Sequence, residues 1–244
     1  SLVVWLAWLR YNEGRFAEAA DLHARAARMA ADPGTRAGSL TSRVNALMDR
    51  HRLDGAREAV QEAFAAVAPT RDPALEARLL SMQRSVEYRL GVAAAPDRDI
   101  PDLIGQTDNR NLEAFSSVTE AAIAWRAGRL DEAHSLASRA ARIYLALGMT
   151  HRACLPEALR LASSPSPDIA EARGLAKRIA ACPVPGLAIQ AAGLLAMAVP
   201  DLAPPIPDAW LAALPRHTWA IRREILSVEE ALYRRVERRG KDGS

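Results

Sequence analysis

The sequence predicts an all-α fold, organised as a solenoid of antiparallel helix pairs. Half of the 244 residues are hydrophobic but only 5% are aromatic, so alanine and leucine supply much of the apolar content. That composition suits closely packed helices better than a β-sandwich, which needs Val, Ile, Tyr and Phe. Two stretches that begin at Tyr11 and Trp125 match at 9 of 18 positions, and weaker copies lie between them. One helix–turn–helix unit is therefore expected to repeat along the chain.

Each strong copy is expected to form a helix, a glycine turn and an alanine-rich second helix. Gly14 and Gly128 follow the first helices, where glycine adopts a left-handed conformation at low cost. Glu18 and Glu132 fall in the first turn of the second helices and complement the helix dipole there. An alanine at every third or fourth position then lets two helix backbones approach closely.

Weaker copies at residues 48–67 and 88–104 complete the array. The first has His51 at the turn, and the second has Gly91 there, followed by a proline-bearing loop. The four turn positions are separated by 37, 40 and 37 residues, which gives a period of about 38.

These copies resemble the tetratricopeptide repeat family. The matching residues are Leu6, Ala7, Tyr11, Gly14, Phe16, Ala19, Ala26 and Pro33 in the first copy, and Ala121, Trp125, Gly128, Leu130, Ala133 and Ala140 in the fourth. The resemblance covers about residues 1–165. It departs from the family period of about 34 residues, and the third copy lacks the second-helix alanine. It implies a right-handed superhelix of five to six helix pairs, similar to the divergent repeats of large bacterial signalling proteins and transcriptional regulators.

Two further regions follow the repeats. Residues 166–206 predict a degenerate helical repeat, with Asp168 near the start of one helix and a buried helix, too short to span a membrane, over 185–200. Residues 207–244 predict a capping helix and a tail, because a terminal repeat needs a polar outer face. The basic run at 233–241 either complements the dipole of that helix or marks a junction with a nucleic-acid-binding domain.

Charge and cysteine content restrict the partners. The net charge is +3, and residues 216–244 supply the whole excess, so the body of the chain is balanced. A balanced surface has no general electrostatic attraction for nucleic acid or an anionic membrane. Cys154 and Cys182 are the only cysteines, which is no disulfide framework and favours a reduced, cytoplasmic setting.

No motif in the sequence indicates catalysis, a metal site or a cofactor. The chain has no CxxC, HExxH, P-loop or GxGxxG pattern. His151 and Cys154 lie three residues apart on a predicted helix, so their side chains can meet. A Cys–His nucleophile pair is one interpretation, and a buried cysteine beside a surface histidine is the other. We expect the chain not to be an enzyme.

The resemblance implies a binding groove lined by the C-terminal ends of the first helices. Carried over by register, the groove residues are Trp8, Tyr11, Asn12, Asn45, Met48, Tyr88, Arg89, Trp125 and Arg126. Aromatic side chains there offer rigid surface for a peptide, and the two arginines are suited to hold a carboxylate. Alternatively, Tyr11, Tyr88 and Trp125 pack between adjacent repeats.

Three functional hypotheses follow. The first is a non-catalytic module of a larger signalling protein that binds a protein, a peptide or another domain of its own chain. The second is a sensor in which a small anionic effector lies by Arg89 and Arg126. The third is a scaffold that dimerises through the apolar helix at 185–200.

Overall fold

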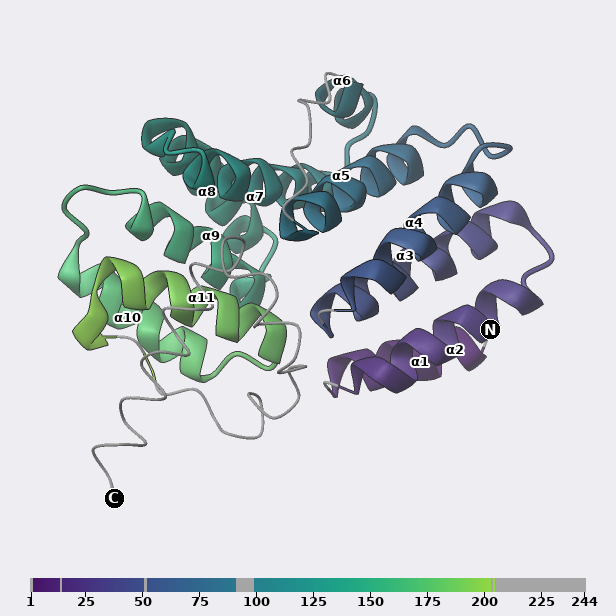
Figure 1. Ribbon diagram of the computed structural model, residues 1–244, viewed down its shortest axis with the longest axis horizontal. Helices are drawn as coiled ribbons and strands as arrows, with labels where there is room; N and C mark the ends of the chain where they lie inside the picture. The colour runs from purple at the N-terminus through teal and green to yellow at the C-terminus, as the bar shows by residue number, and fades with distance from the viewer. Residues whose placement is uncertain (1, 14, 51, 91–98, 203, 205–244) are drawn as a thin grey trace. The chain divides into compact units, whose positions relative to one another are not determined.

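In the part of the chain that the structure describes, helices are the only regular secondary structure. The structure is a computed structural model that describes residues 2–13, 15–50, 52–90, 99–202 and 204. This part contains eleven α-helices and one 3₁₀ helix, with no strand, which confirms the predicted all-α class (Figure 1). The chain divides into two compact units, Ser1–Ser116 and Ser117–Ser244.

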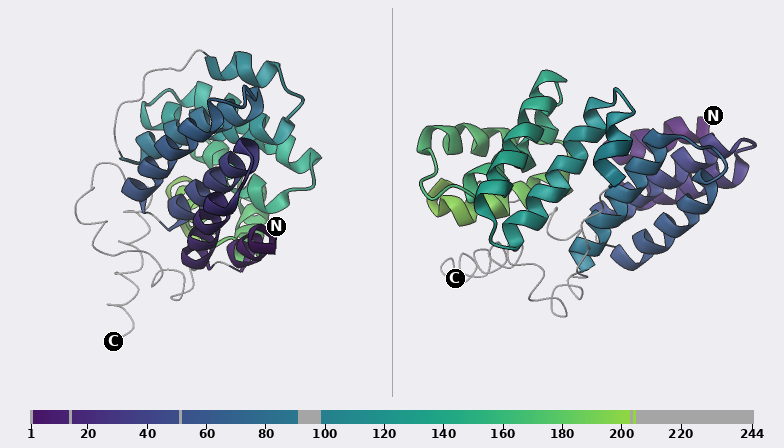
Figure 2. Two further views of the ribbon diagram at one scale, coloured as in Figure 1. Left: turned by 90° about the vertical axis from the view of Figure 1, so that its right-hand side faces the viewer. Right: turned by 90° about the horizontal axis from the view of Figure 1, so that it is seen from above.

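Unit 1 is built from helices that pack on their neighbours in sequence. They are α1 (Leu2–Asn12), α2 (Phe16–Met29), α3 (Pro33–Asp49), α4 (Leu53–Val67), α5 (Pro73–Leu90) and α6 (Asp99–Gly105). Each helix from α1 to α5 contacts the next one, and α3 also contacts α5, so α1 to α4 lie side by side in Figure 2. The next helix, α7 (Arg110–Arg126), crosses the division between the units.

The turns between the two helices of a repeat share one backbone geometry. One arginine precedes each of the helices α2, α4 and α8 (Leu130–Ala146). Its φ and ψ are −83° and 58° at Arg15, −86° and 63° at Arg52, and −82° and 72° at Arg129. The amide of each donates to the carbonyl five residues earlier, at 2.8, 2.9 and 3.0 Å. Before Arg129, Gly128 has φ +75°, the left-handed conformation that such a helix end requires. The three aligned turns therefore share a backbone geometry, which Met149, before the helix that begins at Thr150, also adopts with φ −88° and ψ 57°.

The second helices carry a small, buried residue in their first turn or just after it. Ala19, Ala56 and Ala133 hold equivalent positions after these turns, and all three are fully buried. The large apolar residue that begins each second helix differs in exposure: Phe16 and Leu53 are buried, whereas Leu130 is exposed. A fully buried alanine at this position is thus common to these three copies.

Unit 2 is organised around one helix, α9 (Thr150–Ala162). It contacts α8, α10 (Ile169–Ala180) and α11 (Pro185–Ala198), and a short 3₁₀ helix η1 (Pro200–Leu202) closes on α11. Asp168 caps α10 by accepting from the Glu171 amide at 2.9 Å, which confirms the predicted helix start. Most described side chains of α11 are buried, as predicted for this apolar segment.

Some predicted features lie outside the described residues. Gly14, His51 and Gly91 are among them, and so is the capping helix predicted within 207–244. Across the described ranges, every helix is too short or too polar to cross a membrane.

Candidate functional site

A side-chain hydrogen bond joins the C-terminal ends of α1 and α3, which are the first helices of the first and second repeats. The Tyr11 hydroxyl donates to Asp49 Oδ2 at 2.5 Å, across 38 residues of sequence. The Tyr11 ring also lies edge-on to Phe16, with ring centroids 5.3 Å apart. It packs against Ala19 and Ala46, so it touches α2 and α3 as well. Tyr11 therefore ties one repeat to the next.

The equivalent aromatic residue in unit 2 makes an equivalent link. Trp125 Nε1, at the end of α7, donates to the Ala162 carbonyl at the end of α9, at 3.3 Å and 37 residues away. In both units the aromatic side chain thus donates a hydrogen bond to the C-terminal end of the first helix of the next repeat. This is the inter-repeat packing that the sequence offered as the alternative to ligand contact.

The remaining groove residues of unit 1 differ in accessibility. Met48 is buried in the core cluster between α3, α4 and α5. Trp8 is exposed and lies edge-on to Trp5, at 5.6 Å between ring centroids. Asn12 is exposed and donates from Nδ2 to the Trp8 carbonyl at 2.8 Å, while Asn45 on α3 is half-buried. Trp8, Asn12 and Asn45 are the predicted residues that a ligand can reach most readily here.

The arginines of the predicted groove belong to different units. Arg126 and Tyr88 are both half-buried, the first in unit 2 and the second in unit 1. Arg89 lies near the end of α5, and its side chain is outside the described part of the chain. The pairing of the two arginines around one carboxylate remains a prediction.

Exposed ion pairs recur at the turn into the second helix. Arg15 approaches Glu18 at 2.6 Å, and Arg129 approaches Glu132 at 2.7 Å, 114 residues further on. Such exposed pairs contribute little stability. Their recurrence supports the alignment of the first and fourth copies.

Cys154 has the surroundings of a structural thiol. It is fully buried, its Sγ lies 3.6 Å from the Thr150 carbonyl, and burial raises its pKa to about 11. The thiolate that a nucleophile needs is therefore scarce at neutral pH. The neighbouring His151 is half-buried, and burial together with the nearby Arg152 lowers its pKa. These surroundings match the buried-cysteine interpretation of the pair.

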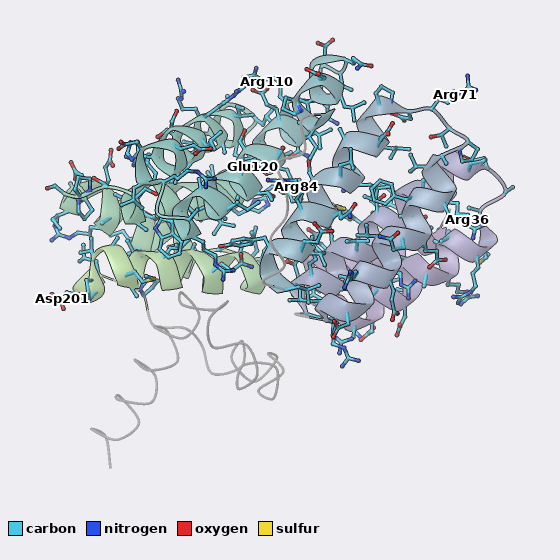
Figure 3. The ribbon with its side chains drawn as sticks, turned by 45° about the horizontal axis from the view of Figure 1, so that its top comes forward. Arg36, Arg71, Arg84, Arg110, Glu120 and Asp201 are labelled. Carbon is cyan, nitrogen blue, oxygen red and sulfur yellow. The ribbon has the colours of Figure 1, made fainter. Side chains whose placement is uncertain are left out.

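Two buried polar residues of unit 1 were not singled out from the sequence. Arg84 on α5 is buried, whereas Arg36 and Arg71 are exposed (Figure 3). His23 on α2 is 5% exposed, its Nδ1 has no hydrogen-bond partner among the described residues, and burial lowers its pKa to about 4. His23 could have been found by comparing the copies, because it occupies the position at which the fourth copy has the small apolar residue Ala137.

Compared with known protein families, curated proteins and solved structures, the chain matches none. The tetratricopeptide resemblance therefore stays a prediction from its residues. In the described ranges, no group of three or more His, Cys, Asp or Glu side chains is placed to hold a metal ion.

Proposed function

We propose that this chain is a non-catalytic protein- or peptide-binding module of a larger bacterial signalling or regulatory protein in the cytoplasm. Its tetratricopeptide-like helix pairs form a right-handed superhelical solenoid, and the partner is a peptide or another domain of the same chain. The observation that carries this proposal is the link between successive first-helices. Because Tyr11 bonds to Asp49 and Trp125 bonds to Ala162, equivalent positions on consecutive repeats stand next to each other.

The accessible side chains of unit 1 suit an extended peptide. Trp8 offers an exposed indole with a large apolar surface and one N–H donor. Asn12 and Asn45 carry amides, each of which both donates and accepts, as the backbone of a peptide does. The aromatic residues that tie the repeats together hold these groups on rigid helices. We expect these two amides and the indole to bind a peptide backbone and one apolar side chain.

The dimerisation alternative receives less support. Helix α11 places Leu194 and Leu195 in the interior, and it packs against α9 and α10. An apolar face that is already covered within one chain has little left to offer a second copy. We therefore prefer the groove to α11 as the working surface.

A peptide library tests this function. The strongest binder is selected on the intact chain, and its affinity is then measured by fluorescence polarisation for Asn12→Ala combined with Asn45→Ala. Loss of two amide contacts is expected to weaken binding at least about fivefold, since each contributes about 0.5–1.5 kcal/mol. Gln61→Ala, which removes an exposed amide from α4, is the control and should leave the affinity unchanged. Equal affinities in all three proteins would place the binding surface elsewhere.

A further inference from the structure

Helix α1 is apolar on two faces, but only one of them is covered. Residues 2–9 read LVVWLAWL, without a polar side chain. Ala7 is fully buried on the side that packs against α2. The α1 outer face, defined as Leu2, Trp5 and Leu9, is 88%, 65% and 46% exposed. A helix that is apolar all round is normally buried on all sides, and a contiguous exposed apolar patch marks an interaction surface.

The repeat itself indicates what covers this face. The turn positions 14 and 91 are 77 residues apart, so the α1 outer face corresponds to Leu79, Met82 and Val86 on α5. These three side chains are at most 1% exposed. They belong to the core cluster that also contains residues of α3 and α4, the two helices of the preceding repeat. In the third repeat, then, this face is the one that packs on the repeat before it.

The second repeat leads to the same assignment. With the 37-residue offset between the first two turns, Leu2 corresponds to Ser39 and Leu9 to Ala46 on α3. Ser39 and Ala46 are buried, and Ser42, the equivalent of Trp5, is half-buried. Ala46 lies in a cluster with Ala19 and Ala20 of α2. The same face is therefore covered by the preceding second helix in two repeats.

We infer that the α1 outer face is a docking surface for an amphipathic α-helix of this same repeat type, packed on α1 as α4 packs on α5. The buried residues that α4 contributes to the shared core are alanines and valines, and only the partly buried Phe64 is large; they are Ala56, Ala59, Val60, Ala63, Ala66 and Val67. Small residues leave room for large side chains from the facing helix, and Leu2, Trp5 and Leu9 are large. The occupant is thus a helix with an alanine- and valine-lined face. This surface adjoins the proposed peptide groove, because Trp5 lies edge-on to Trp8, but the inference does not rest on the proposed function.

A repeat graft tests the docking. A second copy of residues 33–78, which comprises α3, α4 and the start of α5, is fused directly before Leu2, so that Leu2 follows Arg78 as Leu79 does. The reporter is Leu2→Cys, labelled with a thiol reagent in the fused and the unfused chain. Both native cysteines are buried and burial raises the pKa of each thiol, so their background labelling is slow.

Docking is expected to slow the labelling of Leu2→Cys at least tenfold in the fused chain. Met29→Cys, at an exposed position on α2, should be labelled equally fast in both chains and is the matched control. Glutamate at the copied equivalents of Ala59 and Ala63 should restore fast labelling, because charges cannot be buried on that face.

Equal labelling of Leu2→Cys with and without the graft would overturn the assignment, whether or not the copied helices fold. Protection that survives the two glutamates would also overturn it, since the protecting contact would not be the alanine-lined face. If the unfused chain is already protected and sediments as a dimer, the occupant is a second copy, and a repeat-type helix is wrong.

Discussion

Acidification is expected to destabilise unit 1 through the buried histidine of α2. Burial lowers the pKa of His23 to about 4, from an ordinary value of 6.5. In the unfolded chain this imidazole takes up a proton below pH 6.5, whereas in the folded chain it does so only near pH 4. The unfolded state therefore binds more protons between these values, and stability falls as the pH falls through that window.

The size of the effect follows from the two pKa values. One pKa unit corresponds to about 1.36 kcal/mol, so the shift of His23 removes about 2 kcal/mol of stability at pH 5 and about 3 kcal/mol below pH 4. Above pH 7 the imidazole is neutral in both states and contributes no pH dependence. His151 has a pKa lowered in the same direction, so a comparison of variants is needed to isolate His23.

Urea unfolding at pH 8 and pH 5 measures the difference. His23→Ala should lose about 2 kcal/mol less than the parent chain between the two pH values. Alanine is a suitable replacement because Ala137 occupies the equivalent, fully buried position in the fourth copy. The same pH dependence in the parent and in His23→Ala would refute the buried, neutral state of this side chain.

Three more predictions concern packing, the turn and the groove. Ala19→Leu should overpack the fully buried contact of α2 and cost roughly 1–3 kcal/mol in urea unfolding, so an unchanged midpoint would contradict the register. Gly128→Ala should destabilise by roughly 1 kcal/mol because φ is +75°, whereas Gly38→Ala, inside α3 with open space around its Cβ, should stabilise by a similar amount. Arg89→Ala and Arg126→Ala, each as a single substitution, should weaken the binding of an acidic peptide. Early unfolding of either variant would instead assign that arginine a structural role.

Local chemistry explains what was predictable. The start of α10 follows from Asp168, whose carboxylate caps the helix, and the turn before α8 follows from Gly128. These signals need only a few neighbouring residues. The fully buried alanines were predictable too, since Ala19 and Ala133 repeat at one position of a recognisable unit.

Burial by distant neighbours explains what was not predictable. Phe16 and Leu130 occupy equivalent positions, yet the first is buried and the second is exposed. The pattern along each helix is the same, so the difference comes from packing that no local window contains. Likewise, the hydrogen bond from Tyr11 joins residues 38 apart, and the sequence left open whether this ring contacts a ligand or the next repeat. The repeat register assigned both Met48 and Trp8 to the groove, although Met48 is buried in the core and Trp8 is exposed.

The most direct test of a peptide-binding groove is amide hydrogen exchange on the chain with and without its selected peptide. The groove predicts slower exchange in residues 8–12 and 45–49, the C-terminal ends of α1 and α3, while the exchange of α2 and α4 stays unchanged. Protection confined to α2 and α4, or no protection at a peptide concentration that saturates binding, would contradict it.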